Sequence, residues 1–177
     1  MYKRQVPFGA ALTRISTNVT DTAVGTVRIA GEARVHLGSN ATLAAYGDWT
    51  NAAVFTSESN GVVTLAGAAP AAVYGASQFG VFAIPEPGKA VVFEAGRTNT
   101  VSGSLELSGV ALRSSESNAW WYLTLVPGAA QDVKSVRVRD SNAGGGQTIR
   151  NAGRPVDEGN NVNWEFSYPR GTCVIIR

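Results

Sequence analysis

Short apolar segments recur along the chain, separated by glycine, asparagine, serine or proline. They are rich in β-branched and aromatic side chains, which is typical of β-strands. No stretch sustains the 3.6-residue apolar period of a helix, and Gly or Pro interrupts almost every window long enough for one. From Thr26 onward the pattern predicts strands over 27–29, 34–37, 42–46, 53–55, 62–66, 71–74, 81–84, 90–93, 104–107, 120–125 and 135–139.

Two series of apolar positions repeat with a period near 20 residues. One has three steps of 19, then steps of 20 and 24: Val35, Val54, Val73, Val92, Leu112 and Val136. The other has steps of 20, 19, 23 and 18: Leu43, Val63, Phe82, Leu105 and Leu123. Such a period, with two or more short strands in each, is typical of a β-solenoid, in which each period is one coil. We therefore predict an all-β fold, a single-stranded right-handed parallel β-helix.

The chain is expected to divide into one module and two short ends. Residues 6–167 form the β-helix module, with 134–167 as its closing coil and cap, and 168–177 form a tail or linker. Residues 1–5, MYKRQ, resemble the translation of a transposon-end sequencing adapter, which occurs at the start of reading frames from fragmented metagenomic assemblies. We therefore expect an artefact there and a fragment of a larger protein.

Composition and charge narrow the function classes. The 177 residues suit one domain, and charged residues make up only 16%. Without Lys3 and Arg4, 13 basic residues balance 13 acidic ones, so the pI of 8.9 is no argument for a nucleic-acid partner. No apolar run approaches the ~20 residues that span a bilayer, so no membrane insertion is expected. A single cysteine, Cys173, precludes an internal disulfide.

Three stretches resemble a module of large bacterial surface and secreted β-helix proteins of the adhesin or autotransporter-passenger kind. The first has a Gly-Asp-Trp-Thr-Asn start, and the second an aromatic strand with a Pro-containing loop. The third has a Leu-Arg-Ser-Ser start and ends in Val-Asp-Glu-Gly-Asn-Asn-Val-Asn-Trp-Glu-Phe. The stretches are 47–67, 79–109 and 112–167. The sequence departs from the module at Arg137, Arg139 and Arg154, where less charge is expected.

The resemblance implies a pectin-lyase-like β-helix in an extracellular or cell-surface setting. It implies a role as stalk, spacer or passenger, with glycans or host cell-surface components as partners. It transfers no catalytic residue to this sequence.

Clustered carboxylates are the best candidates for chemistry, because β-helix glycosidases and lyases use Asp or Glu in a groove. The candidates are Asp132, Asp140, Arg137 and Asp157, of which Asp140 and Asp157 could approach each other one coil apart. The alternative, which we favour, is that Asp140 and Asp157 are turn residues whose side chains accept backbone N–H bonds. Calcium could use the same oxygens, but no repeated nonapeptide or EF-hand loop supports it.

Other side chains leave two further alternatives open. His36 is the only histidine, and its strand pattern turns it away from Val35 and Leu37. With one histidine and one cysteine, neither a metal nor a cofactor is expected. Trp120 and Trp121 must face opposite sides of a strand, one inward and one outward. The main hypothesis is thus a structural or adhesive segment without catalysis. The alternative is a carbohydrate-active enzyme or a carbohydrate-binding module on the same fold.

Overall fold

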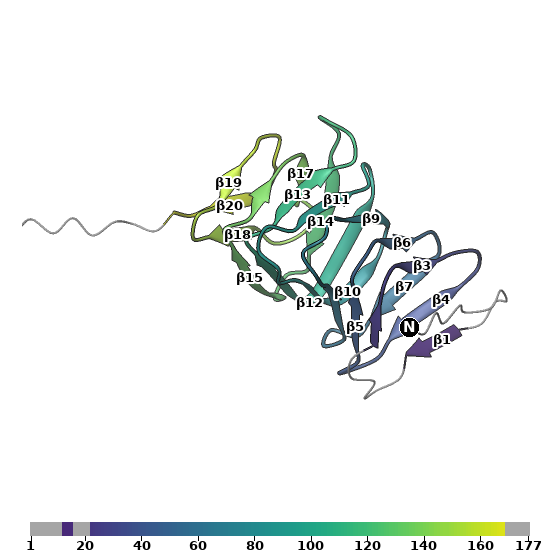
Figure 1. The fold of residues 1–177 in the computed structure, drawn as a ribbon. Helices are drawn as coiled ribbons and strands as arrows, with labels where there is room; N and C mark the ends of the chain where they lie inside the picture. The colour runs from purple at the N-terminus through teal and green to yellow at the C-terminus, as the bar shows by residue number, and fades with distance from the viewer. Residues whose placement is uncertain (1–11, 16–21, 169–177) are drawn as a thin grey trace, which may run out of the picture.

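The chain is a parallel β-solenoid of about six turns in the computed structural model, which describes residues 12–15 and 22–168. Within these residues there are 20 strands and no helix, and every strand pair is parallel. Figure 1 shows the turns stacked from the N-terminal to the C-terminal end. The all-β prediction and the parallel solenoid are confirmed, whereas residues 1–5 and most of 168–177 lie outside the described residues.

The strands form three faces. The first face begins with the three-stranded sheet of β1 (Leu12–Ile15), β4 (Arg34–Leu37) and β7 (Val54–Ser57). It continues through residues 78–79 and 98–101 into β14 (Trp121–Leu125) and β17 (Ser141–Asn142), which are hydrogen-bonded to the ten-stranded sheet. The second contains β2 (Thr22–Val24), β5 (Thr42–Ala45), β8 (Val62–Leu65), β10 (Gln78–Ile84), β12 (Thr98–Ser108), β15 (Ala130–Lys134), β18 (Ile149–Ala152) and β20 (Trp164–Phe166). The third contains β3 (Val27–Ile29), β6 (Trp49–Asn51), β9 (Ala71–Gly75), β11 (Ala90–Phe93), β13 (Ala111–Ser114), β16 (Arg137–Val138) and β19 (Val156–Asp157).

The longest strands turn the corner between the first two faces. The beginning of β12 pairs with β14, and its end pairs with β15. Likewise, Gln78 and Phe79 of β10 pair with the beginning of β12, and a register shift follows before Val81. One continuous strand therefore contributes to two faces of the same coil.

The second predicted series follows a real column of the solenoid. Leu43 pairs with Val63, Val63 with Phe82, and Phe82 with Leu105. All four side chains are buried. The last member is wrong, because Leu105 pairs with Gln131 instead of Leu123.

The first predicted series has the right period but the wrong register. Val35 pairs with Phe55, and Val73 pairs with Phe93, so Val54 and Val92 are each displaced by one residue. A shift of one residue turns a strand side chain to the other side of the sheet, and Val54 is accordingly 41% exposed. Two later steps are also displaced, because Val92 pairs with Arg113 instead of Leu112, and Leu112 pairs with Val138 instead of Val136. The step from Val54 to Val73 joins residues of different faces.

The spacing fails because the corner loops differ in length. Paired residues are only 15 positions apart between Ile149 and Trp164, but 26 apart between Ser104 and Ala130. A fixed period of 19 or 20 therefore follows the coils only where consecutive loops happen to match.

The strand predicted over 135–139 is shorter than expected. Ser135 and Asp140 have φ angles of 56° and 55°, in the left-handed region that ends a strand, so only Arg137–Val138 remains extended. The strand predicted over 120–125 begins instead at Trp121. Several short strands were not predicted, including β6, β13, β15, β18 and β20.

Aromatic stacking fills much of the interior. Trp49 packs edge-on against Phe55 at a centroid distance of 4.7 Å, and Phe93 stacks on Trp121 at 4.1 Å. Burying each such ring contributes roughly 1.5–3 kcal/mol or more. Among the described residues, no helix has the length and apolar character needed to cross a bilayer.

Candidate functional site

Asp140 lies at the corner between the third and first faces and is only 2% exposed. Its Oδ1 accepts a hydrogen bond from Nδ2 of Asn160 at 2.7 Å, and its Oδ2 accepts one from the backbone N of Asn118 at 3.3 Å. Nε of Arg139 lies 3.4 Å from Oδ2. Both carboxylate oxygens are therefore occupied, and the residue connects the loop before β14 to the next coil.

Asp157 has the local contacts of a turn residue. Its Oδ1 accepts hydrogen bonds from the backbone N of Gly159 at 2.9 Å and from Nδ2 of Asn161 at 2.6 Å. Asn161 also donates to the carbonyl of Val138 at 2.8 Å. Asp140 and Asp157 thus lie near one corner, but neighbouring asparagines connect them to the fold and no hydrogen bond joins the two carboxylates.

The other two candidates lie elsewhere. Asp132 is on β15 of the second face, where its Oδ1 is 2.7 Å from Nζ of Lys134. Arg137 is on β16 of the third face and donates from Nε to Glu158 at 2.8 Å. The structure therefore does not bring Asp132, Asp140 and Arg137 into one groove. Within the described part of the chain, no three His, Cys, Asp or Glu side chains could hold a metal ion together.

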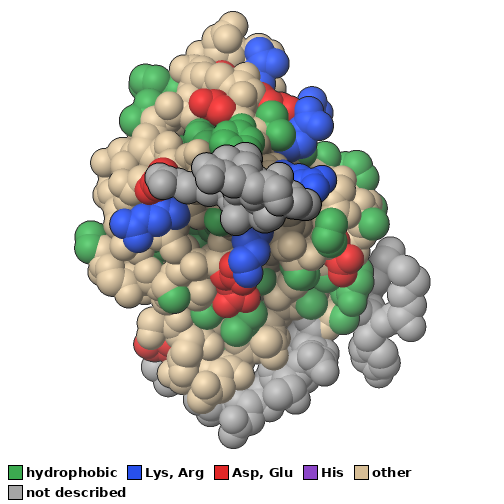
Figure 2. All heavy atoms as spheres, turned by 90° about the vertical axis from the view of Figure 1, so that its left-hand side faces the viewer, with side chains coloured by type: hydrophobic (Ala, Val, Ile, Leu, Met, Phe, Trp, Pro, Cys, Tyr) green, Lys and Arg blue, Asp and Glu red, His purple; other side chains and the backbone are tan. Residues whose placement is uncertain are grey.

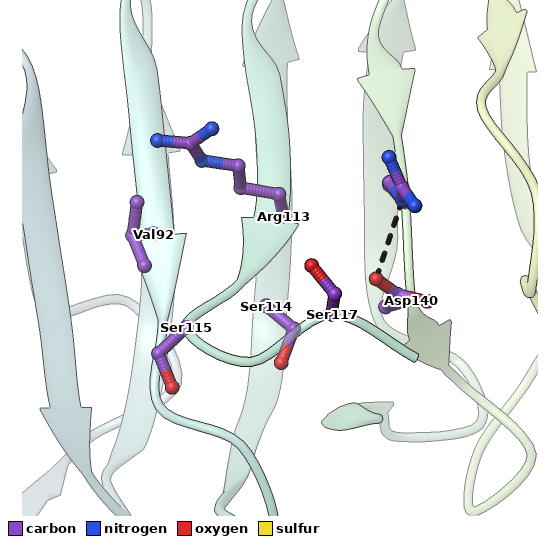
Figure 3. Close-up of a pocket in the computed structure, with 7 residues that line it drawn as sticks. Val92, Arg113, Ser114, Ser115, Ser117 and Asp140 are labelled. Carbon is purple, nitrogen blue, oxygen red and sulfur yellow. Dashed lines mark ion pairs between the residues drawn. The ribbon is translucent and has the colours of Figure 1, made fainter. Parts of the chain in front are cut away.

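A shallow hollow of about 290 Å³ lies beside Asp140. Residues of β11, of β13 and the loop after it, and of the bend after β16 line it. Figure 3 shows Ser114 at the end of β13 and Ser115 and Ser117 of the following loop on one side of it. Arg113 and Asp140 lie around the remainder. Its lining is mostly polar: Val92, Arg113, Ser114, Ser115, Ser117, Arg139 and Asp140. Sequence reasoning did not predict this hollow, because Arg113 and the serines come from a coil that precedes Asp140.

Cationic groups dominate the hollow. Arg113 pairs across the sheet with Val92, which places its side chain on the outer surface. Among the described residues, its guanidinium has no hydrogen-bond or ion-pair partner. Arg139 forms an ion pair with Asp140 through Nε, at 3.4 Å from Oδ2. The lining of the hollow therefore contains two guanidinium groups and one carboxylate, whose oxygens are already hydrogen-bonded.

Trp120 and Trp121 face opposite sides, as predicted, and Trp120 is the outward one. It is 39% exposed, whereas Trp121 is fully buried. Nε1 of Trp120 donates to the carbonyl oxygen of Asn160 at 3.1 Å and to Oδ1 of Asn160 at 2.9 Å. Because Asn160 also donates to Asp140, the indole belongs to the same hydrogen-bonded corner as the hollow.

The other tryptophans and the histidine form hydrogen bonds between turns of the solenoid. Trp49 is buried and donates to Oγ of Ser77 at 3.0 Å. Trp164 packs against the core and donates to Oγ of Ser141 at 3.0 Å. His36 turns outward from the buried Leu37, as predicted, with Nδ1 3.0 Å from Oγ1 of Thr56 on the next coil. These side chains connect neighbouring turns.

Lys89 is a buried charged residue that the sequence did not lead us to expect. It is fully buried, and its Nζ donates to three carbonyl oxygens of the preceding coil: Ala66 at 3.1 Å, Gly67 at 2.9 Å and Ala69 at 2.6 Å. Burial lowers its pKa below the usual 10.5, against the opposing charges of Glu86 and Asp48. Nothing in the sequence distinguishes it from an exposed loop lysine.

At the C-terminal end of the stack, the visible surface has no large patch of a single charge sign. Figure 2 shows basic and acidic side chains close to one another in small mixed groups. This fits the cross-coil ion pair of Arg150 with Glu165 at 3.5 Å, as well as that of Arg137 with Glu158.

These features define the chain as a parallel β-solenoid with a polar hollow at a corner. Comparison of the chain with protein-family models, curated proteins and solved structures gives no match.

Proposed function

We propose that this chain is a structural or adhesive segment, without catalysis, of a bacterial surface or secreted protein. The main support is that polar side chains at the corners form structural hydrogen bonds. Asp140, Asp157, Asn161 and Lys89 are all engaged in hydrogen bonds that hold corners and join coils. The surface setting, with glycans or host cell-surface components as partners, rests on the resemblance of 47–67, 79–109 and 112–167 to β-helix adhesin modules.

The architecture suits a spacer. In a parallel solenoid each coil contacts mainly its neighbours, so stiffness and length follow from the number of coils. The buried column Leu43, Val63, Phe82 and Leu105 runs through consecutive coils and supplies such continuity. A stalk or passenger needs this property more than it needs a reactive centre.

A carbohydrate-active enzyme is the weaker alternative. It requires two or three carboxylates, or a carboxylate with a cation, on one groove. Asp132 and Arg137 lie on different faces, and each is paired with a neighbour. A carbohydrate-binding module has more support, because aromatic rings are common sugar platforms and Trp120 is exposed. Its indole is hydrogen-bonded to Asn160, which also donates to Asp140 of the polar hollow.

Polysaccharide cleavage distinguishes the enzyme from the structural segment. The protein is incubated with a panel of neutral and acidic polysaccharides, and new reducing ends and unsaturated products are measured. We expect no release above a heat-denatured control. Cleavage that Asp140→Asn or Asp132→Asn abolishes, with thermal unfolding unchanged, would contradict the proposal.

The stability of two variants, Asp140→Ala and Asp132→Asn, tests the structural role of Asp140. Asp140→Ala should lower the free energy of unfolding by about 2–4 kcal/mol, because two donors lose a charged acceptor and alanine is disfavoured at positive φ. Asp132→Asn, which removes an exposed ion pair, should change it by less than ~1 kcal/mol. Urea unfolding measures both, and equal effects would argue against a structural role for Asp140.

A further inference from the structure

The geometry points to an anion-binding site in the hollow that Arg113 and Arg139 line. We propose that it binds an oxyanion group, either a sulfate, phosphate or carboxylate borne by a ligand or the free inorganic ion. The proposal adds a ligand class to the adhesive role and does not depend on it, since a spacer could bind anions in the same way.

The two arginines lie side by side on neighbouring coils. Leu112 pairs with Val138, so Arg113 and Arg139 are the next residues on adjacent parallel strands, and the backbone N of Arg139 donates to the carbonyl of Leu112 at 3.0 Å. Adjacent strands are about 4.8 Å apart. Like charges at neighbouring positions of a sheet repel each other, and an anion between them would remove that cost.

The nearby carboxylate does not neutralise the pair. Both oxygens of Asp140 accept hydrogen bonds from Asn160 and Asn118, and Arg139 reaches only one of them, at 3.4 Å from Nε. The terminal nitrogens of Arg139 and the whole guanidinium of Arg113 remain without partners among the described residues. Guanidinium groups bind carboxylate, sulfate and phosphate by paired hydrogen bonds.

The serines beside the hollow differ in the donors they offer. Oγ of Ser114 accepts from the backbone N of Glu116 at 3.3 Å, and Oγ of Ser115 accepts from the backbone N of Ala95 at 3.0 Å. Each of these hydroxyls keeps its own hydrogen to donate, and Ser117 has no partner within the described residues. Figure 3 shows the hydroxyl of Ser117 turned toward Arg113, whereas those of Ser114 and Ser115 point away from it. Ser117 is therefore the serine that would donate to an oxyanion beside Arg113.

The loop that carries the serines is fixed in place. The backbone N of Asn118 donates to the buried Asp140, and the backbone N of Ser115 donates to the carbonyl of Phe93 at 2.7 Å. Asp140 therefore positions the loop and would not contact the anion through a free oxygen. The donors are ordered before a ligand arrives, which lowers the entropic cost of binding.

Titration followed by NMR tests this site. Sodium sulfate replaces sodium chloride at constant ionic strength while the backbone amides of 113–118 and 139–140 are followed. We expect saturable shifts there, and Arg113→Gln should raise the Kd about tenfold, the usual effect of losing one charge-assisted hydrogen bond. Arg28→Gln is the matched control, because Arg28 is an exposed arginine on the same face, on β3, with Thr50 as its neighbour.

Two further arms distinguish the sources of the anion. Methyl glucuronide competing with sulfate, with methyl glucoside inert, would show that a carboxylate on a sugar is accepted. Sulfate or phosphate binding without glucuronide binding would support the site for inorganic oxyanions or their esters. No saturable shift with any of the three anions, or equal weakening by Arg28→Gln and Arg113→Gln, would overturn the proposal.

Discussion

At the scale of single residues, Lys89 shows how this fold uses charge. Its ammonium group is enclosed completely and meets three carbonyl oxygens of the preceding coil. A charged group in such a place is disfavoured by desolvation, which lowers the pKa of Lys89, and the charges of Glu86 and Asp48 oppose this. The side chain therefore stabilises a corner at an electrostatic cost.

This cost makes stability depend on pH. The folded pKa of Lys89 lies below 10.5, so between that pKa and 10.5 the unfolded chain binds more protons than the folded chain. The free energy of unfolding should therefore rise with pH in this window, relative to Lys89→Met. Urea unfolding of both proteins, in steps from neutral pH up to 10.5, gives the difference. A difference that stays constant, or falls as pH rises, would show that Lys89 is not desolvated.

The contrast between Asp140 and Lys89 shows what the sequence reveals at this scale. Asp140 precedes Ser141 and Asn142, which is a recognisable turn sequence, and the turn interpretation agrees with its φ of 55° and its occupied oxygens. Lys89 follows a Pro- and Gly-containing loop that looks solvent-exposed. Its partners are backbone carbonyls 20 or more positions away, which no local pattern specifies.

At the scale of elements, glycines permit the close approach of a turn to the strands beyond it. Gly80 and Gly103 stand just before Val81 and Ser104, which pair one coil apart. A Cβ at Gly80 would lie 1.7 Å from the carbonyl oxygen of Glu58, and one at Gly103 would lie 1.7 Å from that of Ser59. Neither position tolerates a side chain without movement of the backbone.

Gly103→Ala should therefore destabilise the protein by about 3 kcal/mol, at the upper end of the usual cost of overpacking, because the obstructing atom is backbone. Gly25→Ala is the control, since no atom lies within 4 Å of its added Cβ. Thermal unfolding measures both variants. Similar unfolding temperatures for the two would show that the turn at Ser59 does not lie against Gly103.

The register of the strands was predictable only in part. Phe82 was placed correctly between Val63 and Leu105, because three consecutive coils there keep apolar residues at steps of 19 and 23. Val54 and Val92 were misplaced by one residue, because β-branched residues occupy both sides of these strands and a one-residue error still lands on an apolar side chain. The corner loops, whose lengths set the step, carry no signal of their geometry.

At the scale of the whole molecule, the coils form a nearly one-dimensional stack whose C-terminal end is marked by aromatic residues. Trp164 and Phe166 pack against the core, with ring centroids 6.4 Å apart. The indole of Trp164 also donates to Ser141 of an earlier strand. The prediction that 134–167 closes the stack fits these contacts and remains a prediction.

A nearly one-dimensional stack should respond locally to damage. Trp164→Ala should increase amide hydrogen exchange in β17 and β18, which lie next to it, while β8 and β10 keep their protection. Tyr168→Ala is the matched control, because Tyr168 is an aromatic residue four positions away that is 64% exposed. Uniform loss of protection across all coils would mean that the molecule unfolds as one cooperative unit.

The central claim is that parallel coils stack on one another and that their polar side chains join neighbouring coils. This claim depends most directly on which strands are neighbours. Nuclear Overhauser contacts between backbone protons measure this in solution. The account predicts contacts from Phe82 to Val63 on one side and to Leu105 on the other. Antiparallel contacts joining 90–93 to 104–107, with none between residues one coil apart, would contradict it.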